Sequence, residues 1–448
     1  MKILTAEYVL PTAGKSISDG AVLIEGPKIL AVGPINEIKE IYPSAAVEDF
    51  GVAAILPGFV NCHSHLEISA MRGLLDDVEH DFFTWLITLT KNRSQLSDEE
   101  IKLAALAGAA EGAAAGVTCF GDIGRFGAAG AYALKAVGLR GVVFQETEFS
   151  PDNMTAKKDF DILIEKTEKL STEQTDLVEI GISPHSPYTV SRSLFEKIGG
   201  YASAHNTKIT THAAESSQED ELLRFGTGFF SGLYEKFGAG WESPKQSPVE
   251  FLESTGIFSS RPLLAHCVMA TETDLELVKA SGASIAHCPK SNAKFGHGYA
   301  PLEMMLEKEV TVGLGSDSVA SNNVCDILEE ARFAALAARN RNGRSRFISS
   351  REVLELATLG GAKGLLLDDK IGSLETGKQA DLAVVALDHV GQMPVNDAAH
   401  ALVFSSNSRD VVMTMVAGQE IYRDGEFKTF AIAELRSELR KIAAKLSI

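Results

Sequence analysis

Short runs of β-branched and apolar residues alternate with longer helical patterns through the middle of the chain, and this alternation restricts the fold more than any other feature. Eight such runs occur, at residues 55–60, 117–121, 141–146, 178–183, 208–211, 261–265, 283–286 and 310–315. Helical patterns between them include residues 98–115 and residues 350–359, where Ser350 is a suitable N-cap. Strands that alternate with helices predict βα units on a parallel sheet. The pattern favours a closed (β/α)8 barrel of the α/β class, although an open doubly wound sheet would look similar locally.

Both ends of the chain have a different, all-β texture. Strand-like runs separated by glycine turns occur at residues 2–9, 21–25, 29–32, 382–385, 411–416 and 420–423. We therefore expect the two ends to pair into one small β-sandwich beside the barrel. The predicted division is residues 1–55 and 368–448 for the sandwich and residues 56–367 for the catalytic barrel. A final helix over residues 431–446 has an apolar stripe and is expected to pack against the protein.

The charge and composition argue against several classes of partner. The formal net charge is −18, which disfavours nucleic acid and anionic membrane surfaces, because both are bound through clustered Lys and Arg. No segment approaches the ~20 apolar residues that a membrane span needs, and the first residues meet a charge before any apolar run develops. The five cysteines form no Cys-x-x-Cys pair, which suits a reducing compartment. We therefore expect a cytoplasmic protein with buried, unpaired cysteines.

Histidines stand where the predicted strands end: the chain has 11, and six directly follow apolar runs. His63 and His65 follow the first run, and alternate residues on a strand face the same way, so both imidazoles can bind one metal ion. His212 follows the fifth run and Asp317 follows the eighth. The carboxyl ends of barrel strands meet on one face. We therefore expect these four residues to hold one divalent metal ion, Zn²⁺ first and Fe²⁺ as the alternative, with room for a water. The fourth run contains no lysine that could bridge a second metal.

Other strand-end residues are candidates for proton transfer. Glu215, three residues after His212, is the best candidate for moving a proton from the water to the leaving group. A solvated glutamate that opens a helix is the alternative interpretation. His266 could polarise the reacting centre or orient the hydroxide, or it could be a buried structural histidine. Asp317 can also act as a general base, because it would lie next to the water.

These segments together resemble the amidohydrolase superfamily, in its branch of mononuclear deaminases and chlorohydrolases. The resemblance is carried by PGFVNCHSH at residues 57–65, THAAE at 211–215, HCPKSN at 287–292, GSD at 315–317 and GSLETGKQADL at 372–382. It covers essentially the whole chain. It implies hydrolytic removal of an amino or halide group from a nitrogen heterocycle, with the same four metal ligands and the same three proton-handling residues.

Within that branch, two groups of enzymes are similar to this chain around the substrate. The segments that contain His185 and Trp85 resemble deaminases of methylthioadenosine and S-adenosylhomocysteine, and this implies that both side chains contact the nucleoside. Greater similarity to aminodeoxyfutalosine deaminases is found at residues 65–69, 226–230 and 291–298. The preferred prediction is therefore a deaminase of 6-amino-6-deoxyfutalosine. Glu67 is then a substrate contact, or alternatively a partner of a ligating histidine.

Several alternatives stay open on the sequence alone. A methylthioadenosine or S-adenosylhomocysteine deaminase comes next, followed by a free-base or pterin deaminase and an s-triazine chlorohydrolase. Glu215 favours ammonia over chloride as the leaving group, because an amine departs readily only after protonation. A scaffolding relative without chemistry predicts broken ligand positions, and these are intact. We predict no catalytic role for His287 or His297. A homodimer is expected only because two-fold dimers are the commonest assemblies.

Overall fold

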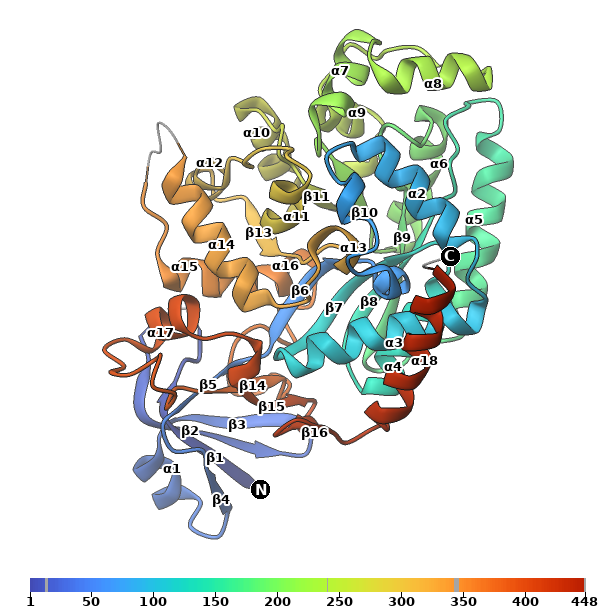
Figure 1. The fold of residues 1–448 in the computed structure, drawn as a ribbon. Helices are drawn as coiled ribbons and strands as arrows, with labels where there is room; N and C mark the ends of the chain where they lie inside the picture. Colours follow the sequence, from blue (N-terminus) through green and yellow to red (C-terminus); the bar gives the residue numbers. More distant parts are fainter. Residues whose placement is uncertain (13–14, 240, 342–345, 447–448) are drawn as a thin grey trace.

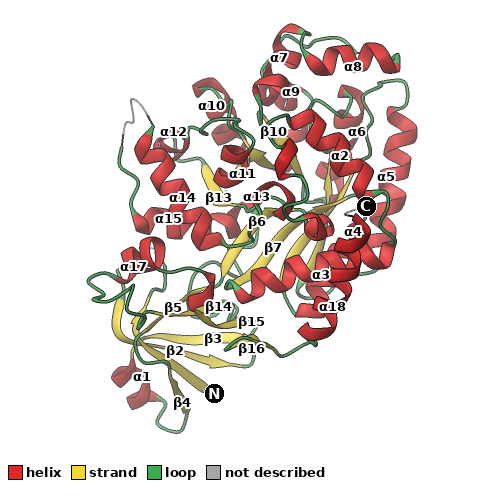
Figure 2. Ribbon diagram, in the orientation of Figure 1, coloured by secondary structure: helices red, strands yellow, loops and turns green. Residues whose placement is uncertain are grey.

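The computed structural model describes residues 1–12, 15–239, 241–341 and 346–446. Its strands gather into two regions (Figure 1): a parallel region from the middle of the chain, surrounded by helices, and a sheet to which both chain ends contribute. The colouring by secondary structure in Figure 2 shows the helices around the parallel strands, which places the chain in the α/β class. Among the described residues, no helix combines the length and hydropathy that crossing a bilayer requires.

Eight parallel strands form the middle of the chain, in two four-stranded sheets. The first sheet contains, in order, β6 (Phe59–Ser64), β7 (Val117–Gly124), β8 (Arg140–Glu146) and β9 (Val178–Ser183). The second contains β10 (Thr210–Ala213), β11 (Leu263–His266), β12 (Ser284–His287) and β13 (Thr311–Leu314). Isolated parallel bridges join the sheets at both edges, Ile182 to Ile209 and Ser64 to Asp317. The carboxyl ends of all eight strands therefore share one side of the molecule.

Several helices of the parallel region begin at side-chain caps. Ser97 and Glu100 make a capping box at the start of α3, and Thr271 and Asp274 make another at α10. The helices that lie among or beside the parallel strands are α2 (Phe82–Arg93), α3 (Asp98–Ala114), α4 (Gly127–Val137), α5 (Ala156–Ser171), α6 (Arg192–His205), α7 (Ser217–Phe225), α8 (Phe229–Phe237), α9 (Pro248–Ser254), α10 (Glu272–Ser281), α11 (Pro289–Lys294), α12 (Leu302–Glu307), α13 (Val319–Asn322), α14 (Ile327–Asn340), α15 (Ser350–Glu355) and α16 (Gly361–Gly364).

Nine strands form the other sheet, and both chain ends supply them. They are β1 (Lys2–Val9), β2 (Ile17–Glu25), β3 (Lys28–Pro34), β4 (Ala46–Asp49), β5 (Ala53–Pro57), β14 (Leu382–Ala386), β15 (Val411–Val416), β16 (Gln419–Arg423) and β17 (Glu426–Phe427). The order is β17-β16-β15-β14-β5-β1-β2-β3, with β4 paired to β1. The two short helices α1 (Ile35–Ile41) and α17 (Ala398–Ser405) also lie in the terminal segments. The predicted final helix forms as α18 (Ile432–Leu446) and packs on α3, with Leu435 and Ile442 buried.

The first predicted strand of the parallel region, residues 55–60, is wrong as a single strand. The structure divides it at Gly58 into β5, which pairs antiparallel with β14, and β6, which pairs parallel with β7. Pro57 cannot donate a backbone hydrogen bond, and a Cβ on Gly58 would lie 2.1 Å from Cγ2 of Thr118. The chain therefore passes from one sheet to the other at this Pro-Gly pair.

Two further expectations need correction. The N-cap of α15 is Ser349, whose side chain accepts from the Glu352 amide, and Ser350 is the first helical residue. The predicted helix over residues 350–359 also changes to a π-helical turn over Leu356–Gly360. Strand bounds elsewhere in the parallel region differ from the predicted ones by up to three residues, because apolar runs do not mark where hydrogen-bonded pairing begins. The five cysteines are buried and unpaired, as expected.

A buried ion pair joins the two regions. Nε of Arg140 on β8 donates to Oδ2 of Asp381 at 2.7 Å, and the side chains are only 4% and 1% exposed. Asp381→Ala leaves a buried guanidinium without its carboxylate, so we expect the free energy of unfolding to fall by about 3–5 kcal/mol. Glu426 forms an ion pair with Lys428 and its side chain is 78% exposed. Glu426→Ala should therefore change the free energy of unfolding by less than about 0.5 kcal/mol. Urea denaturation measures the free energy of unfolding of both variants. Equal losses would show that the Arg140–Asp381 ion pair does not stabilise the contact between the two regions.

Candidate active site

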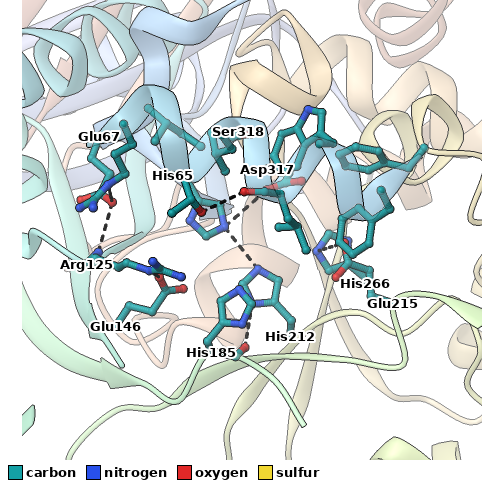
Figure 3. A pocket seen from close by; sticks show the side chains of 18 of the residues that line it. His65, Glu67, Arg125, Glu146, His185, His212, Glu215, His266, Asp317 and Ser318 are labelled. Atoms are coloured by element: carbon teal, nitrogen blue, oxygen red, sulfur yellow. Dashed lines mark hydrogen bonds and ion pairs between the residues drawn. The ribbon is translucent and has the colours of Figure 1, made fainter. Parts of the chain in front are cut away.

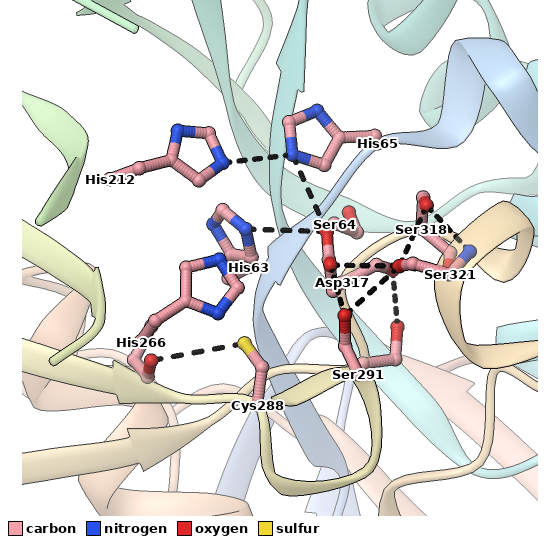
Figure 4. Close-up of polar contacts among 12 residues, drawn as sticks. His63, Ser64, His65, His212, His266, Cys288, Ser291, Asp317, Ser318 and Ser321 are labelled. Atoms are coloured by element: carbon pink, nitrogen blue, oxygen red, sulfur yellow. Dashed lines mark hydrogen bonds and ion pairs between the residues drawn. The ribbon is translucent and has the colours of Figure 1, made fainter. Parts of the chain in front are cut away.

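Three histidines and an aspartate converge where the parallel strands end (Figure 4). Nε2 of His65 lies 3.3 Å from Nε2 of His212, and Oδ1 of Asp317 lies 3.5 Å from Nε2 of His63 and 3.5 Å from Nε2 of His65. Ligand atoms of the three histidines all lie within 4.8 Å of one another. The structure therefore brings together, from β6, β10 and the end of β13, the four residues that the sequence nominates as metal ligands.

Neighbouring groups orient this cluster. Nδ1 of His212 lies 2.8 Å from the His185 carbonyl oxygen, so Nδ1 carries the proton and the lone pair of Nε2 is directed at the cluster. Ser291 and Ser321 donate to Oδ2 of Asp317 at 2.6 and 2.8 Å, which leaves Oδ1 for the histidines. Both ring nitrogens of His63 are buried without a hydrogen-bond partner among the described residues. A buried imidazole in that state is suited to metal binding.

The charge state of the cluster also suits a cation. Burial lowers the pKa of His63 to about 4, and burial with the neighbouring His185 lowers the pKa of His212 well below its usual value. These rings are therefore neutral, as metal ligands must be. Burial opposes ionisation of Asp317, but the adjacent imidazoles outweigh it and hold the pKa of that carboxyl well below its usual range. The donor set is thus three imidazole nitrogens and one carboxylate, which fits Zn²⁺ or Fe²⁺.

Backbone strain accompanies the strand ends. Ala214, His266 and Asp317 have φ angles of 51°, 73° and 57°, in the left-handed region that costs a residue with a side chain about 1–3 kcal/mol. The amide of Asp317 donates to the His63 carbonyl at 3.0 Å and holds one of these conformations in place. Such strain concentrates at functional sites.

Glu215 lies beside the cluster, in a buried polar network. Its Oε1 is 3.7 Å from Nε2 of His266, and its Oε2 accepts from the Tyr188 hydroxyl at 3.3 Å. Burial raises the pKa of the Glu215 carboxyl. Nδ1 of His266 lies 2.9 Å from Oδ1 of Asn292, so Nε2 is the nitrogen that faces Glu215. Nε2 of His297 also approaches Oε1 of Glu215, at 3.8 Å.

A pocket opens above these residues (Figure 3). Its cavity volume is about 100 Å³, and Figure 3 shows the side chains that surround it. One wall is apolar and is formed by Ile68, Phe82, Trp85, Leu86, Leu89 and Phe295. The polar side chains that line the pocket include Glu67, Arg93, Arg125, Glu146 and His185. His65, His212, Glu215, His266 and Asp317 line it from below, so the pocket can present one end of a ligand to all of them.

The three predicted substrate contacts line this pocket in different ways. Trp85 lies on α2 and is 5% exposed, and its ring makes an edge contact with Phe295 at a centroid distance of 4.9 Å. His185 directs Nδ1 to the Thr189 hydroxyl at 2.7 Å, which leaves Nε2 for a ligand. Glu67 is different, because hydrogen bonds engage both of its carboxylate oxygens: Oε1 accepts from Nε of Arg93 at 2.9 Å, and Oε2 accepts from a backbone amide at 2.9 Å.

Sequence reasoning missed several pocket residues. Glu146 ends β8 and Arg125 follows β7, so the strand-end rule would have found both if it had been applied to the second and third strands. Tyr188 carried no such signal, because it does not lie at a strand end. His287 ends β12 but does not line this pocket.

Known proteins are similar to this chain over its whole length. A model described as the amidohydrolase family matches residues 54–421. A 5-methylthioadenosine/S-adenosylhomocysteine deaminase from Thermoanaerobacter pseudethanolicus is 31% identical, over 95% of this chain and 94% of that protein. A 5'-deoxyadenosine deaminase from Methanobrevibacter smithii is 30% identical, over 95% and 94%. A structure of an adenosine deaminase from Xanthomonas campestris with bound zinc is 26% identical, with a TM-score of 0.86 over 99% of this chain and 98% of that chain.

Proposed function

Because the chain belongs to the amidohydrolase family, we propose that it is a hydrolytic deaminase that replaces the exocyclic amino group of an adenosine-type nucleoside with oxygen and releases ammonia. It is thus a hydrolase of a C–N bond in a cyclic amidine. The observation that carries this proposal is the position of Glu215 and His266 beside the His63–His65–His212–Asp317 cluster, in a pocket that combines apolar and polar side chains.

One divalent metal ion, Zn²⁺ first, fits the four converging ligands, His63, His65, His212 and Asp317. When bound there, it supplies the Lewis acidity that makes water nucleophilic at neutral pH. Asp317, an anion with Oδ1 turned into the site, accepts a proton from the attacking water. His266 directs Nε2 toward the same space and orients the water through a hydrogen bond.

Glu215 handles the proton that the leaving group needs. Its raised pKa keeps a larger fraction of the carboxyl protonated near neutral pH, so it can donate to a ring nitrogen of the base as water adds to the neighbouring carbon. Asp317 then gives the proton that it took from the water to the amino nitrogen, so that ammonia can depart, and the proton of the added hydroxyl returns to Glu215 as the carbonyl forms. The Tyr188 hydroxyl donates to the Glu215 side chain, and Oε2 of Glu219 accepts from the Glu215 backbone amide, so both hold Glu215 in position for these transfers.

Within this class, 5'-methylthioadenosine and S-adenosylhomocysteine are placed first. Their deaminases are similar to the chain over 95% of its length, and this reverses the order that the motifs around Glu67 suggested. The apolar wall with Trp85 suits a base or a thioether, which supports the same choice. 6-Amino-6-deoxyfutalosine remains the second candidate, on the sequence motifs alone.

Ammonia release by the zinc-loaded protein tests the proposal. The panel is 5'-methylthioadenosine, S-adenosylhomocysteine, 5'-deoxyadenosine, adenosine, 6-amino-6-deoxyfutalosine, guanine, a pterin and an s-triazine. Clear preference for the first three is expected. Preference for the futalosine derivative would restore the first sequence-based choice, and turnover of only free bases or triazines would overturn a nucleoside substrate.

Trp85→Ala is expected to raise KM by about tenfold or more and to change kcat by less than about threefold. The indole is part of the apolar lining, packs against Phe295 and carries no group that the reaction uses, so its loss should remove ligand contact rather than chemistry. Trp85→Phe keeps a ring and should recover most of the affinity. Steady-state kinetics with 5'-methylthioadenosine give both constants. Unchanged KM in the alanine variant would make Trp85 a packing residue only.

The proposal also includes the architecture around the site. The eight parallel strands close into one barrel, supported by bridges at both seams between the sheets. The nine-stranded sheet folds into a small sandwich, supported by one buried cluster that draws on Leu4, Val22 and Met413. Residues 1–55 and 368–448 then form the sandwich with its terminal helix, and residues 56–367 form the catalytic barrel.

A further inference from the structure

His297 stands beside Glu215 with a buried nitrogen that has no partner. Its side chain is 5% exposed, and its Nε2 lies 3.8 Å from Oε1 of Glu215. That nitrogen makes no hydrogen bond within the described part of the chain. Burial lowers the pKa of His297 to about 4, so the ring is neutral and carries one N–H. A buried nitrogen in this state destabilises the protein unless a partner completes it, and the acceptor that it approaches is the Glu215 carboxyl.

Two glycines and two aromatic rings hold the His297 side chain in this position. Gly296 and Gly298 flank it with φ angles of 68° and 109°, which residues with a side chain rarely adopt. The Phe82 ring makes an edge contact with the imidazole at a centroid distance of 4.9 Å, and the Phe295 ring packs on it at 5.2 Å. The imidazole is therefore fixed beside the carboxyl by both the turn and the packing around it.

The other imidazole near this oxygen cannot donate to it in its neutral form. Nε2 of His266 lies 3.7 Å from Oε1 of Glu215, and Figure 3 shows the two side chains together. However, Nδ1 of His266 donates to Oδ1 of Asn292 at 2.9 Å, so Nε2 of the neutral ring carries only a lone pair, which can accept from the attacking water. Tyr188 donates to the other carboxylate oxygen, Oε2. Of the described groups that approach Oε1, this leaves Nε2–H of His297 as the donor.

We propose that His297 is a positioning residue, which donates Nε2–H to Oε1 of Glu215 and stabilises the carboxylate that forms when Glu215 gives its proton to the base. A distance of 3.8 Å is longer than a hydrogen bond, but catalytic hydrogen bonds are often long in a substrate-free site and tighten when substrate binds. Hydrogen bonds to an ionised acceptor are the stronger kind, so this one gains strength as the proton leaves Glu215. It therefore stabilises the transition state more than the ground state, which accelerates the reaction.

The proposal adds a hydrogen bond to the reaction and no further proton transfer. The proton on Nε2 of His297 stays there throughout, and Glu215 recovers its own proton from the added hydroxyl as the carbonyl forms. From the sequence we predict no catalytic role for His297, and its ring does not line the active-site pocket, so its effect must pass through Glu215. This inference rests on the proposed function, because it concerns the same proton transfer.

His297→Phe tests the inference, because phenylalanine keeps a ring among the aromatic neighbours and removes the donor. With the best nucleoside substrate of the panel, kcat should fall about tenfold, KM should change by less than about threefold, and zinc content should stay complete. The fall of kcat at high pH should also move to higher pH, by at least about half a pH unit. The reaction requires protonated Glu215, and a donor to its anion lowers the pKa of that carboxyl, so loss of the donor raises this pKa.

Other charged and titratable groups act on Glu215, but they are the same in the wild type and in the variant. Their contributions therefore cancel in the comparison of pH profiles. These groups are His65, Tyr188, Glu219, His266 and Asp317.

Three further variants separate a donor from a packing residue. His297→Gln keeps an N–H donor and should recover most of the rate and of the wild-type pH profile. His80→Phe is the matched control, because His80 is exposed and lines the same neighbouring cavity as His297, but not the active-site pocket; kcat should change by less than about twofold. In a Glu215→Gln background, His297→Phe should lower the remaining rate by less than about twofold, because no carboxylate is left to stabilise. If His297→Phe does not fold, His297→Leu removes the donor with a smaller apolar side chain and carries the same expectations.

Three results would overturn the inference while leaving the proposed function intact. They are a kcat of His297→Phe within twofold of the wild type, a high-pH fall of kcat that does not move, and a full tenfold further loss in the Glu215→Gln background, which would make His297 a packing residue. A zinc-loaded wild-type protein that deaminates no nucleoside would overturn the proposed function, and the role of His297 with it.

Discussion

Glu215→Gln is expected to lower kcat by about 10³-fold while the protein keeps its full zinc content. Glutamine preserves the size of the side chain and can still accept from Tyr188, but it has no acidic proton to donate. The carboxylate stands 3.7 Å from His266 and outside the metal-ligand cluster, so its loss should leave metal binding unchanged. Turnover of 5'-methylthioadenosine and zinc content by mass spectrometry are measured on the same preparation.

Glu219→Gln is the control for that variant. Glu219 is also buried, and its Oε2 accepts a hydrogen bond from the backbone amide of Glu215. Burial raises the pKa of Glu219 to about 8. A glutamine there keeps an oxygen acceptor for the Glu215 amide, so we expect less than about a tenfold loss. If Glu215→Gln turned over at a rate close to wild type, proton transfer would have to be reassigned, with His266 and His297, 3.7 and 3.8 Å from Oε1 of Glu215, as the candidates.

The parts of the site that the sequence predicts are those that follow from local geometry. The two histidines of His63-Ser64-His65 share a face because strand residues alternate, and His212 and Asp317 lie at strand ends that parallel pairing brings to one side. The same rule, applied to β7 and β8, would have nominated Arg125 and Glu146. Position at a strand end therefore also predicts Arg125 and Glu146, because it holds for β7 and β8 as it does for the strands that carry the metal ligands.

Other features depend on partners that are distant in the sequence, which a local pattern does not contain. Glu67 lies two residues after His65, yet its role depends on Arg93, 26 residues later on α2. The division of the first predicted strand at Gly58 depends on pairing with β14, more than 300 residues away. The apolar pattern in residues 55–60 is continuous across that point, so it could not show that the chain changes sheets there.

Asp317→Asn is expected to damage metal binding and turnover together. Oδ1 of Asp317 is the anionic member of the cluster, 3.5 Å from the Nε2 atoms of His63 and His65. The asparagine side chain replaces a charged ligand with a neutral one. Because mutation of a residue that only supports a metal ligand can lower metal affinity by up to about 100-fold, loss of a ligand's charge should lower it by at least that factor. Turnover should fall further, because the proton acceptor for the attacking water is lost as well.

Ser321→Ala separates these two effects of Asp317. It removes the 2.8 Å bond to Oδ2 but keeps the carboxylate and the bond from Ser291, so we expect near-complete metal content and a loss of rate below about tenfold. Zinc affinity is measured by competition with a chromophoric chelator, and turnover is measured at saturating zinc. If Asp317→Asn held zinc as tightly as the wild type, the cluster would reduce to three histidines and the anionic ligand would have to be sought elsewhere. If zinc restored full activity to that variant, Asp317 would be a ligand without a part in proton transfer, and His266 and Glu215 would share that task.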